Sequence, residues 1–177
     1  MEDPSAEQAL RTELLRKSGL AVLDTNYSAG GSRPSDVWRL AASGSTVPAA
    51  TVEVLPDFGY LEEVDRQWQF LAEERGLFGE DGEFLISVAG ERVGRLPWAR
   101  VRRLGRMALA HHLVAYPGEP EFVAMSRDAR VMCGVTTEEY DIWIVAGDLP
   151  DRASRSTARD QVADISAAGP CPGRCRA

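Results

Sequence analysis

Three short apolar segments near the end of the chain follow one another so closely that they constrain the whole fold. They are "EFVAMS", "RVMCGV" and "YDIWIVAG", at residues 121–126, 130–135 and 140–147. Their β-branched and aromatic residues favour strands. A parallel pair of strands needs a crossover of a dozen or more residues, and these connections are far shorter. The chain is therefore predicted to contain an antiparallel sheet.

Other strands are expected in the first two thirds of the chain. The segment "EFLISVAGERVGRLPW" predicts a hairpin with its turn at Ala89–Gly90 and a return strand that continues through Val93. Further strands are predicted at residues 20–26, 37–43 and 49–55, with a Gly-, Ser- and Pro-rich loop at 27–36. Between the last two strands, Thr136 and Glu139 match a capping box, which predicts a short helical turn.

Three helices are predicted. The first begins at Pro4, with Asp3 as N-cap, and ends before Gly19. The second starts at Tyr60 and ends at Gly76, with apolar residues spaced three and four apart on one face. The third is expected from Trp98 to Val114, before the helix-breaking "YPGEP".

These elements predict one α+β domain over residues 1–148, with an antiparallel sheet of about five to seven strands packed against three helices. The chain has 177 residues, 44% of them hydrophobic, which suffices for one core without disulfides or metal. Residues 149–177 have no aromatic side chain and few large aliphatic ones. We expect them to form a disordered tail, because they cannot bury enough surface to offset the entropy of ordering.

Charge is unevenly distributed along the chain. The segment at 91–113 holds six arginines, one glutamate and both histidines, although the whole chain has a net charge of −7. On the predicted helix, Arg102, Arg103 and Arg106 lie opposite an apolar face, with Arg100 further round. The bias of 19 arginines to one lysine is typical of a high-GC coding sequence, so the choice of arginine over lysine carries little information.

Three interpretations of the arginine segment stay open. It could pair internally with residues 53–83, which hold ten acids and two arginines. It could form an interaction surface for an acidic protein partner, with Trp98, Arg100, Arg102, Arg103 and Arg106 as contacts. It could also contact nucleic acid, although the acidic chain and the lack of Asn or Gln on the helix argue against this.

The histidines give the only candidate for catalysis. His112 is expected on the apolar face of the predicted helix, where a histidine is usually a core residue with a hydrogen-bond partner. A general-base role would need a carboxylate partner, for which Asp141 is one candidate. This alternative function is a small cofactor-free enzyme or ligand-binding protein whose pocket reaches His112.

No metal or cofactor is predicted. Adjacent histidines point about 100° apart on a helix, so they cannot chelate one ion. Cys171 and Cys175 form a weak pair without further ligands, and Cys133 is expected to be a buried apolar residue. The chain has no apolar run long enough to span a bilayer and no basic, apolar leader, so we expect a cytoplasmic protein without a membrane partner.

The sequence therefore favours an accessory protein that binds another macromolecule through its arginine-rich segment. The histidine-pocket enzyme or binding protein is the first alternative, and a DNA-associated regulator is the second. The sequence leaves the oligomeric state open.

Overall fold

The computed structural model describes residues 4–29, 31–43, 46–55, 59–90 and 95–149. Its helices are α1 (Pro4–Lys17), α2 (Pro34–Ala41), α3 (Tyr60–Glu74) and α4 (Leu109–His112). Its strands are β1 (Leu20–Tyr27), β2 (Ala50–Glu53), β3 (Glu83–Val88), β4 (Trp98–Arg103), β5 (Val114–Tyr116), β6 (Glu119–Pro120), β7 (Phe122–Met125), β8 (Val131–Thr137) and β9 (Asp141–Asp148).

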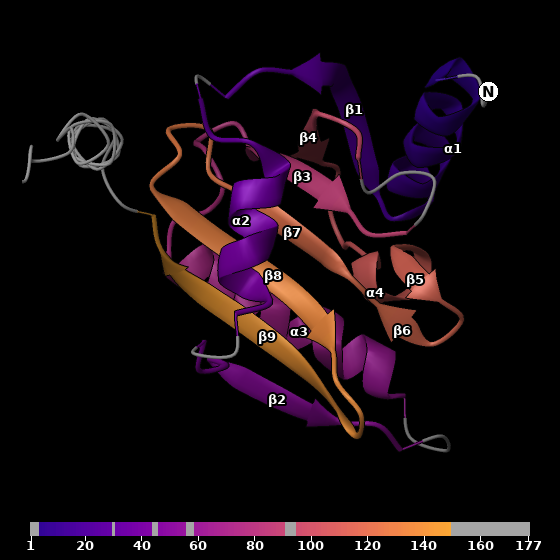
Figure 1. Cartoon of the computed structure of the whole chain (residues 1–177), viewed down its shortest axis with the longest axis vertical. Coiled ribbons are helices and arrows are strands. Elements are labelled where there is room, and N and C mark those ends of the chain that lie inside the picture. The colour runs from indigo at the N-terminus through magenta and orange to yellow at the C-terminus, as the bar shows by residue number, and fades with distance from the viewer. Residues whose placement is uncertain (1–3, 30, 44–45, 56–58, 91–94, 150–177) are drawn as a thin grey trace, which may run out of the picture.

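Seven strands form one antiparallel sheet in the order β1-β4-β3-β7-β8-β9-β2. The three closely spaced C-terminal segments become β7, β8 and β9, paired as successive neighbours. A small ribbon of β5 and β6 lies beside the sheet (Figure 1). The predicted α+β fold with an antiparallel sheet of five to seven strands is confirmed.

The two faces of the sheet bury different clusters. The larger cluster packs α1, α3 and α4 against one face, through residues such as Leu15, Trp68 and Leu109. The smaller cluster packs Val37 and Ala41 of α2 against the other face. Figure 1 shows the same arrangement, with α2 in front of the sheet and α3 behind it. The sheet is therefore covered more fully on the α3 side than on the α2 side.

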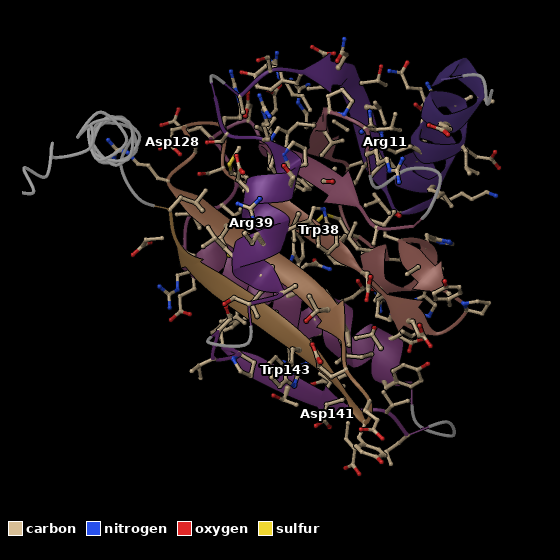
Figure 2. The ribbon with its side chains drawn as sticks, in the orientation of Figure 1. Arg11, Trp38, Arg39, Asp128, Asp141 and Trp143 are labelled. Atoms are coloured by element: carbon tan, nitrogen blue, oxygen red, sulfur yellow. The ribbon has the colours of Figure 1, made fainter. Side chains whose placement is uncertain are left out.

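Arg11 joins α1 to the sheet edge. Its side chain is fully buried and donates hydrogen bonds to the carbonyl oxygens of Thr25 and Pro97 (Figure 2). Burial lowers the pKa of Arg11 to about 10, because desolvation disfavours the charged form. The guanidinium thus links the first helix to β1 and to the residue just before β4.

The predicted helix over residues 98–114 is wrong. Trp98–Arg103 is a strand between β1 and β3, and only Leu109–His112 is helical. Along β4, Trp98, Arg100 and Arg102 face the α2 side, while Ala99 and Val101 enter the larger cluster. Gly105 follows with a φ of +137°, which a helix cannot accommodate. The side chains of β4 therefore follow the two-residue period of a strand rather than the helical spacing, because β4 pairs with β1 on one edge and with β3 on the other.

Two other local predictions are also wrong. The strand predicted at 37–43 belongs instead to α2, where Pro34 stands in the first turn and Val37 and Ala41 bury one face four residues apart. The helical turn predicted at 136–139 is absent from the described chain. There Thr136 and Thr137 continue β8, and the Glu138 amide donates to the Asp141 carbonyl across a hairpin turn.

The predicted chain boundaries fall partly outside the described residues. The strand β3 pairs with β4 as a hairpin, but β4 begins at Trp98, and the predicted continuation through Val93 lies outside the described chain. The predicted N-cap Asp3 also lies outside it. So does the predicted tail, apart from Leu149, which is buried against the α2 side and donates its amide to the Arg130 carbonyl.

Candidate functional site

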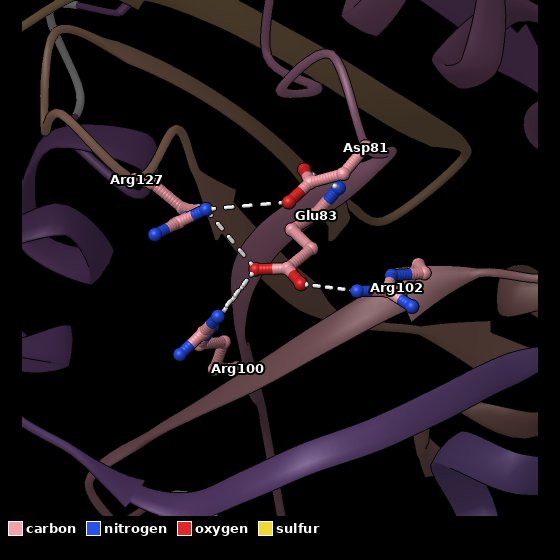
Figure 3. A network of polar contacts seen from close by, with 5 residues as sticks. All are labelled: Asp81, Glu83, Arg100, Arg102 and Arg127. Atoms are coloured by element: carbon pink, nitrogen blue, oxygen red, sulfur yellow. Dashed lines mark hydrogen bonds and ion pairs between the residues drawn. The ribbon is translucent and has the colours of Figure 1, made fainter.

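Three arginines surround one buried carboxylate on the α2 side of the sheet. Glu83 Oε2 lies 2.8 Å from Arg100 and 3.2 Å from Arg127, and Oε1 lies 2.7 Å from Arg102. Asp81 adds a second carboxylate 3.4 Å from Arg127 (Figure 3). We call Arg100, Arg102 and Arg127, with Glu83 at their centre, the arginine array.

Strand register builds this array. Glu83 on β3 stands opposite Arg102 on β4, and Arg100 lies two residues along the same face of β4. Arg127 arrives from the turn between β7 and β8. The hydrogen bond from Arg102 is the largest cause that holds the pKa of the Glu83 carboxyl below its usual range. The carboxylate is therefore charged at neutral pH and fixes all three guanidinium groups.

Internal pairing, one of the three open interpretations, is confirmed for three arginines. Arg100 and Arg102 pair with Glu83, and Arg103 pairs with Glu73 at 2.5 Å. Both glutamates belong to the acidic segment at 53–83. Arg103 faces the opposite side of the sheet, where its guanidinium lies over the Phe78 ring.

The five residues predicted as one contact surface are dispersed in the structure. Only Arg100 and Arg102 lie together. Trp98 is 1% exposed and donates from Nε1 to the Ser32 carbonyl at 2.8 Å, so it is a core residue. Arg106 follows β4 and lines a separate groove. Sequence reasoning missed Arg127, whose membership of the array depends on the pairing of β7 with β3.

That groove, of about 940 Å³, lies between α3 and the segment that leads into α4. Its volume falls within the range of about 300–1,000 Å³ that small-ligand pockets span. It is lined by Gly59, Glu62, Glu63, Asp65, Arg66, Gln69, Phe70, Glu73, Arg106, Met107, Ala108, His111 and His112. We call it the α3–α4 groove.

Asp65 anchors α4 to α3. It is 5% exposed, and its Oδ1 accepts a hydrogen bond from the Ala110 amide at 2.8 Å. Burial is the largest influence on the pKa of Asp65 and raises it, although the Ala110 and Leu109 amides and His111 act in the opposite direction. This side chain fixes one wall of the groove relative to the other.

Both histidines line the groove. His111 has Nε2 3.3 Å from Glu62 Oε1 and Nδ1 3.6 Å from Asp65 Oδ2. His112 is half-buried, and burial is the main cause that lowers its pKa, with smaller contributions from His111 and Lys17. The expectation that His112 lies on a dry helix face is therefore wrong, because α4 is only one turn long and its histidines border an open groove.

Asp141 does not lie in this groove. It begins β9 and pairs in register with Glu53 at the β2 edge of the sheet (Figure 2). The carboxylates next to a histidine are instead Glu62 and Asp65, one helical turn apart on α3. Sequence reasoning missed both, although their three-residue spacing on a helix was visible.

A metal centre, a reactive thiol and a membrane-spanning helix have no counterpart in the described residues. These residues contain no cluster of three or more His, Cys, Asp or Glu side chains arranged to hold a metal ion. Cys133, the free cysteine among them, is buried, and burial raises its pKa to about 12. None of the described helices has the length and apolar character needed to cross a membrane.

No protein-family model matches the chain, and comparison with curated proteins and with solved structures finds no match either.

Proposed function

We propose that the protein acts in the cytoplasm by binding an acidic macromolecular partner, and that the arginine array is the contact. The observation that supports this most is the fixing of three guanidinium groups by one buried carboxylate, Glu83. Arginine side chains lose considerable conformational entropy when a partner immobilises them. In the array, folding has already restricted the three arginine side chains, so less conformational entropy is lost when a partner binds them. This is the general advantage of a preorganised site.

The guanidinium groups remain accessible although they are paired. Arg100, Arg102 and Arg127 are 32%, 46% and 42% exposed, whereas the Glu83 side chain is 2% exposed. A carboxylate can use only part of the donor capacity of three guanidinium forks. Donors on the solvent side are thus left for carboxylates of a partner, which arginine recognises with two parallel hydrogen bonds.

Charge also supports an acidic partner at this position. The three arginines outnumber the two carboxylates of Glu83 and Asp81 by one, on a chain whose net charge is −7. A local positive site on an acidic protein orients a partner and excludes wrong contacts more than it adds affinity. Binding at this array is therefore expected to weaken as salt is raised.

Binding of a defined acidic probe tests the proposal. Poly-glutamate is titrated into the wild-type protein, the Arg102→Gln/Arg127→Gln variant and an Arg39→Gln control. Arg39 lies on α2 on the same side of the sheet and is 78% exposed (Figure 2). We expect the double variant to bind at least tenfold more weakly because it retains only Arg100, and the control to match the wild type.

A duplex DNA probe distinguishes the DNA-associated alternative. Retention of DNA at low salt, lost steeply as salt rises, together with no poly-glutamate binding, would replace the acidic protein partner by nucleic acid. Equal poly-glutamate affinity in the wild type and the double variant would remove the array as the contact. Thermal unfolding of each variant establishes that a loss of binding is not a loss of fold.

A further inference from the structure

The α3–α4 groove has fixed walls that run antiparallel to each other. The Gln69 amide donates to the Met107 carbonyl at 3.2 Å, and the Asp65 carboxylate accepts from the Ala110 amide at 2.8 Å. His111 comes next and lies beside Glu62. The chain directions of α3 and of the facing segment are therefore opposite. Arg106 and His111 thus border opposite ends of the groove.

The two ends carry opposite charge. Arg106 is exposed and lines the groove, and among the described residues its guanidinium has no carboxylate partner. At the other end, the Glu62 carboxylate is 55% exposed and lies against the His111 ring. The groove is therefore dipolar along its length.

The other carboxylates of the groove have closer partners than Glu62, which contacts the His111 ring at 3.3 Å. Glu63 pairs with Arg66 and accepts from Gln67, and Glu73 pairs with Arg103. Asp65 is held by the Ala110 amide. A ligand would thus meet Arg106 and Glu62 as its charged contacts.

An exposed aromatic side chain lies near the Arg106 end of the groove, one residue past Gln69 on α3. Phe70 is 64% exposed and lines the groove, so it offers an apolar contact that the folded chain leaves open. Glu62 and Gln69 are seven residues apart on α3, or about 10 Å along the helix axis at 1.5 Å per residue. Three or four residues of extended chain span about 10–14 Å.

We propose that the α3–α4 groove binds a short extended peptide segment with an acidic group at one end, a basic group at the other and an apolar side chain next to the acidic group. The acidic group pairs with Arg106, the basic group with Glu62, and the apolar side chain packs on Phe70. Because the groove lies on the α3 side of the sheet, this binding is independent of the arginine array on the α2 side.

Three labelled tetrapeptides test the proposal by fluorescence anisotropy. They are Lys-Leu-Leu-Glu, Lys-Leu-Leu-Lys and Glu-Leu-Leu-Glu, amidated and titrated with the full-length protein. On the wild type we expect the dipolar peptide to bind at least threefold more tightly than either peptide of single sign, because only it satisfies both ends. Equal affinity for all three, or no anisotropy change at millimolar protein, overturns the proposal without the need for any variant.

Variants then assign each end. Arg106→Gln should remove the advantage of Lys-Leu-Leu-Glu over Lys-Leu-Leu-Lys, and Glu62→Gln should remove its advantage over Glu-Leu-Leu-Glu. Phe70→Ala should weaken all three peptides severalfold. Arg39→Gln, on the opposite face of the sheet, should change none of them. If Arg39→Gln acts as Arg106→Gln does, the peptides sense net charge alone and the groove is not their site.

Discussion

Glu83 is the residue on which the arginine array depends. In the folded state its pKa is held below the usual range, first by the hydrogen bond from Arg102. A depressed carboxyl pKa stabilises the fold at neutral pH, and that contribution is lost as pH falls from the unfolded-state value, about 4.3, through the folded-state value. The same side chain therefore couples the contact surface to stability in acid.

Glu83→Gln should lower the free energy of unfolding at pH 7, because the three guanidinium groups lose their shared anion. The difference from the wild type should shrink as pH falls below about 4.3, where the wild-type carboxylate becomes protonated. Urea unfolding of both proteins across this range measures it. If the difference in free energy of unfolding stays constant from pH 7 to acid, then the shape of the Glu83 side chain, rather than its charge, stabilises the fold.

Cys133 should resist thiol reagents in the folded protein. Its side chain is fully buried within β8, and burial raises its pKa to about 12, so the reactive thiolate is scarce at pH 8. In a Cys171→Ser/Cys175→Ser background, Ellman's reagent should label Cys133 at least a hundredfold more slowly in buffer than in guanidinium chloride. Rapid labelling in buffer would mean that β8 opens readily.

At the scale of secondary-structure elements, local signals identified most strands and the two longest helices. Two of the exceptions have different physical causes. Trp98–Arg103 satisfies both a helical face and strand alternation, and pairing with β1 and β3 decides between them. The strand predicted over α2 rested on the β-favouring residues Val37 and Trp38. Pro34 predicts the structure correctly, because proline is favoured in the first turn of a helix.

The candidate sites were less predictable than the elements that carry them. The arginines of β4 were visible in the sequence, but Glu83 meets them only through strand register, and Arg127 only through the pairing of β7 with β3. The contact of His111 with Glu62 and Asp65 depends on how α4 packs against α3, more than forty residues away. Such long-range pairings leave no local pattern.

A glycine in β8 leaves room for side chains of the two neighbouring strands on the α2 side of the sheet. A Cβ at Gly134 would lie 3.0 Å from Val123 Cγ1, 3.2 Å from Val145 Cγ2 and 3.5 Å from Ala41 Cβ. Gly134→Ala should therefore destabilise the protein by about 1–3 kcal/mol through overpacking. Chemical denaturation measures this, with Gly147→Ala as the matched control because a Cβ there meets nothing within 4 Å. Equal effects at both positions would show that strand propensity, rather than crowding at Gly134, is responsible.

At the scale of the whole molecule, Leu149 is the last residue that the structure describes. It is 6% exposed and belongs to the cluster under α2. Leu149→Ala should cost about 2–4 kcal/mol, near the range for buried leucines. A chain ending at Leu149 should keep the unfolding midpoint of the full protein, as the composition of residues 150–177 predicts. Thermal unfolding of the full protein, the truncated chain and the Leu149→Ala variant tests this end of the domain. A truncated chain that unfolds at as low a temperature as Leu149→Ala would show that the domain continues beyond residue 149.

The order of strands in the sheet also determines when each strand pair can form as the chain is synthesised. The five central strands come from the stretch between Glu83 and Asp148, but the two edge strands, β1 and β2, come from the first 53 residues. β1 cannot pair until β4 has been synthesised, and β2 cannot pair until β9 has been synthesised. At about 5–20 residues per second, roughly 4–20 s pass on the ribosome before each edge strand can meet its partner. During that interval the nascent chain presents unpaired strands, and chaperones that cover them would raise the yield of folded protein.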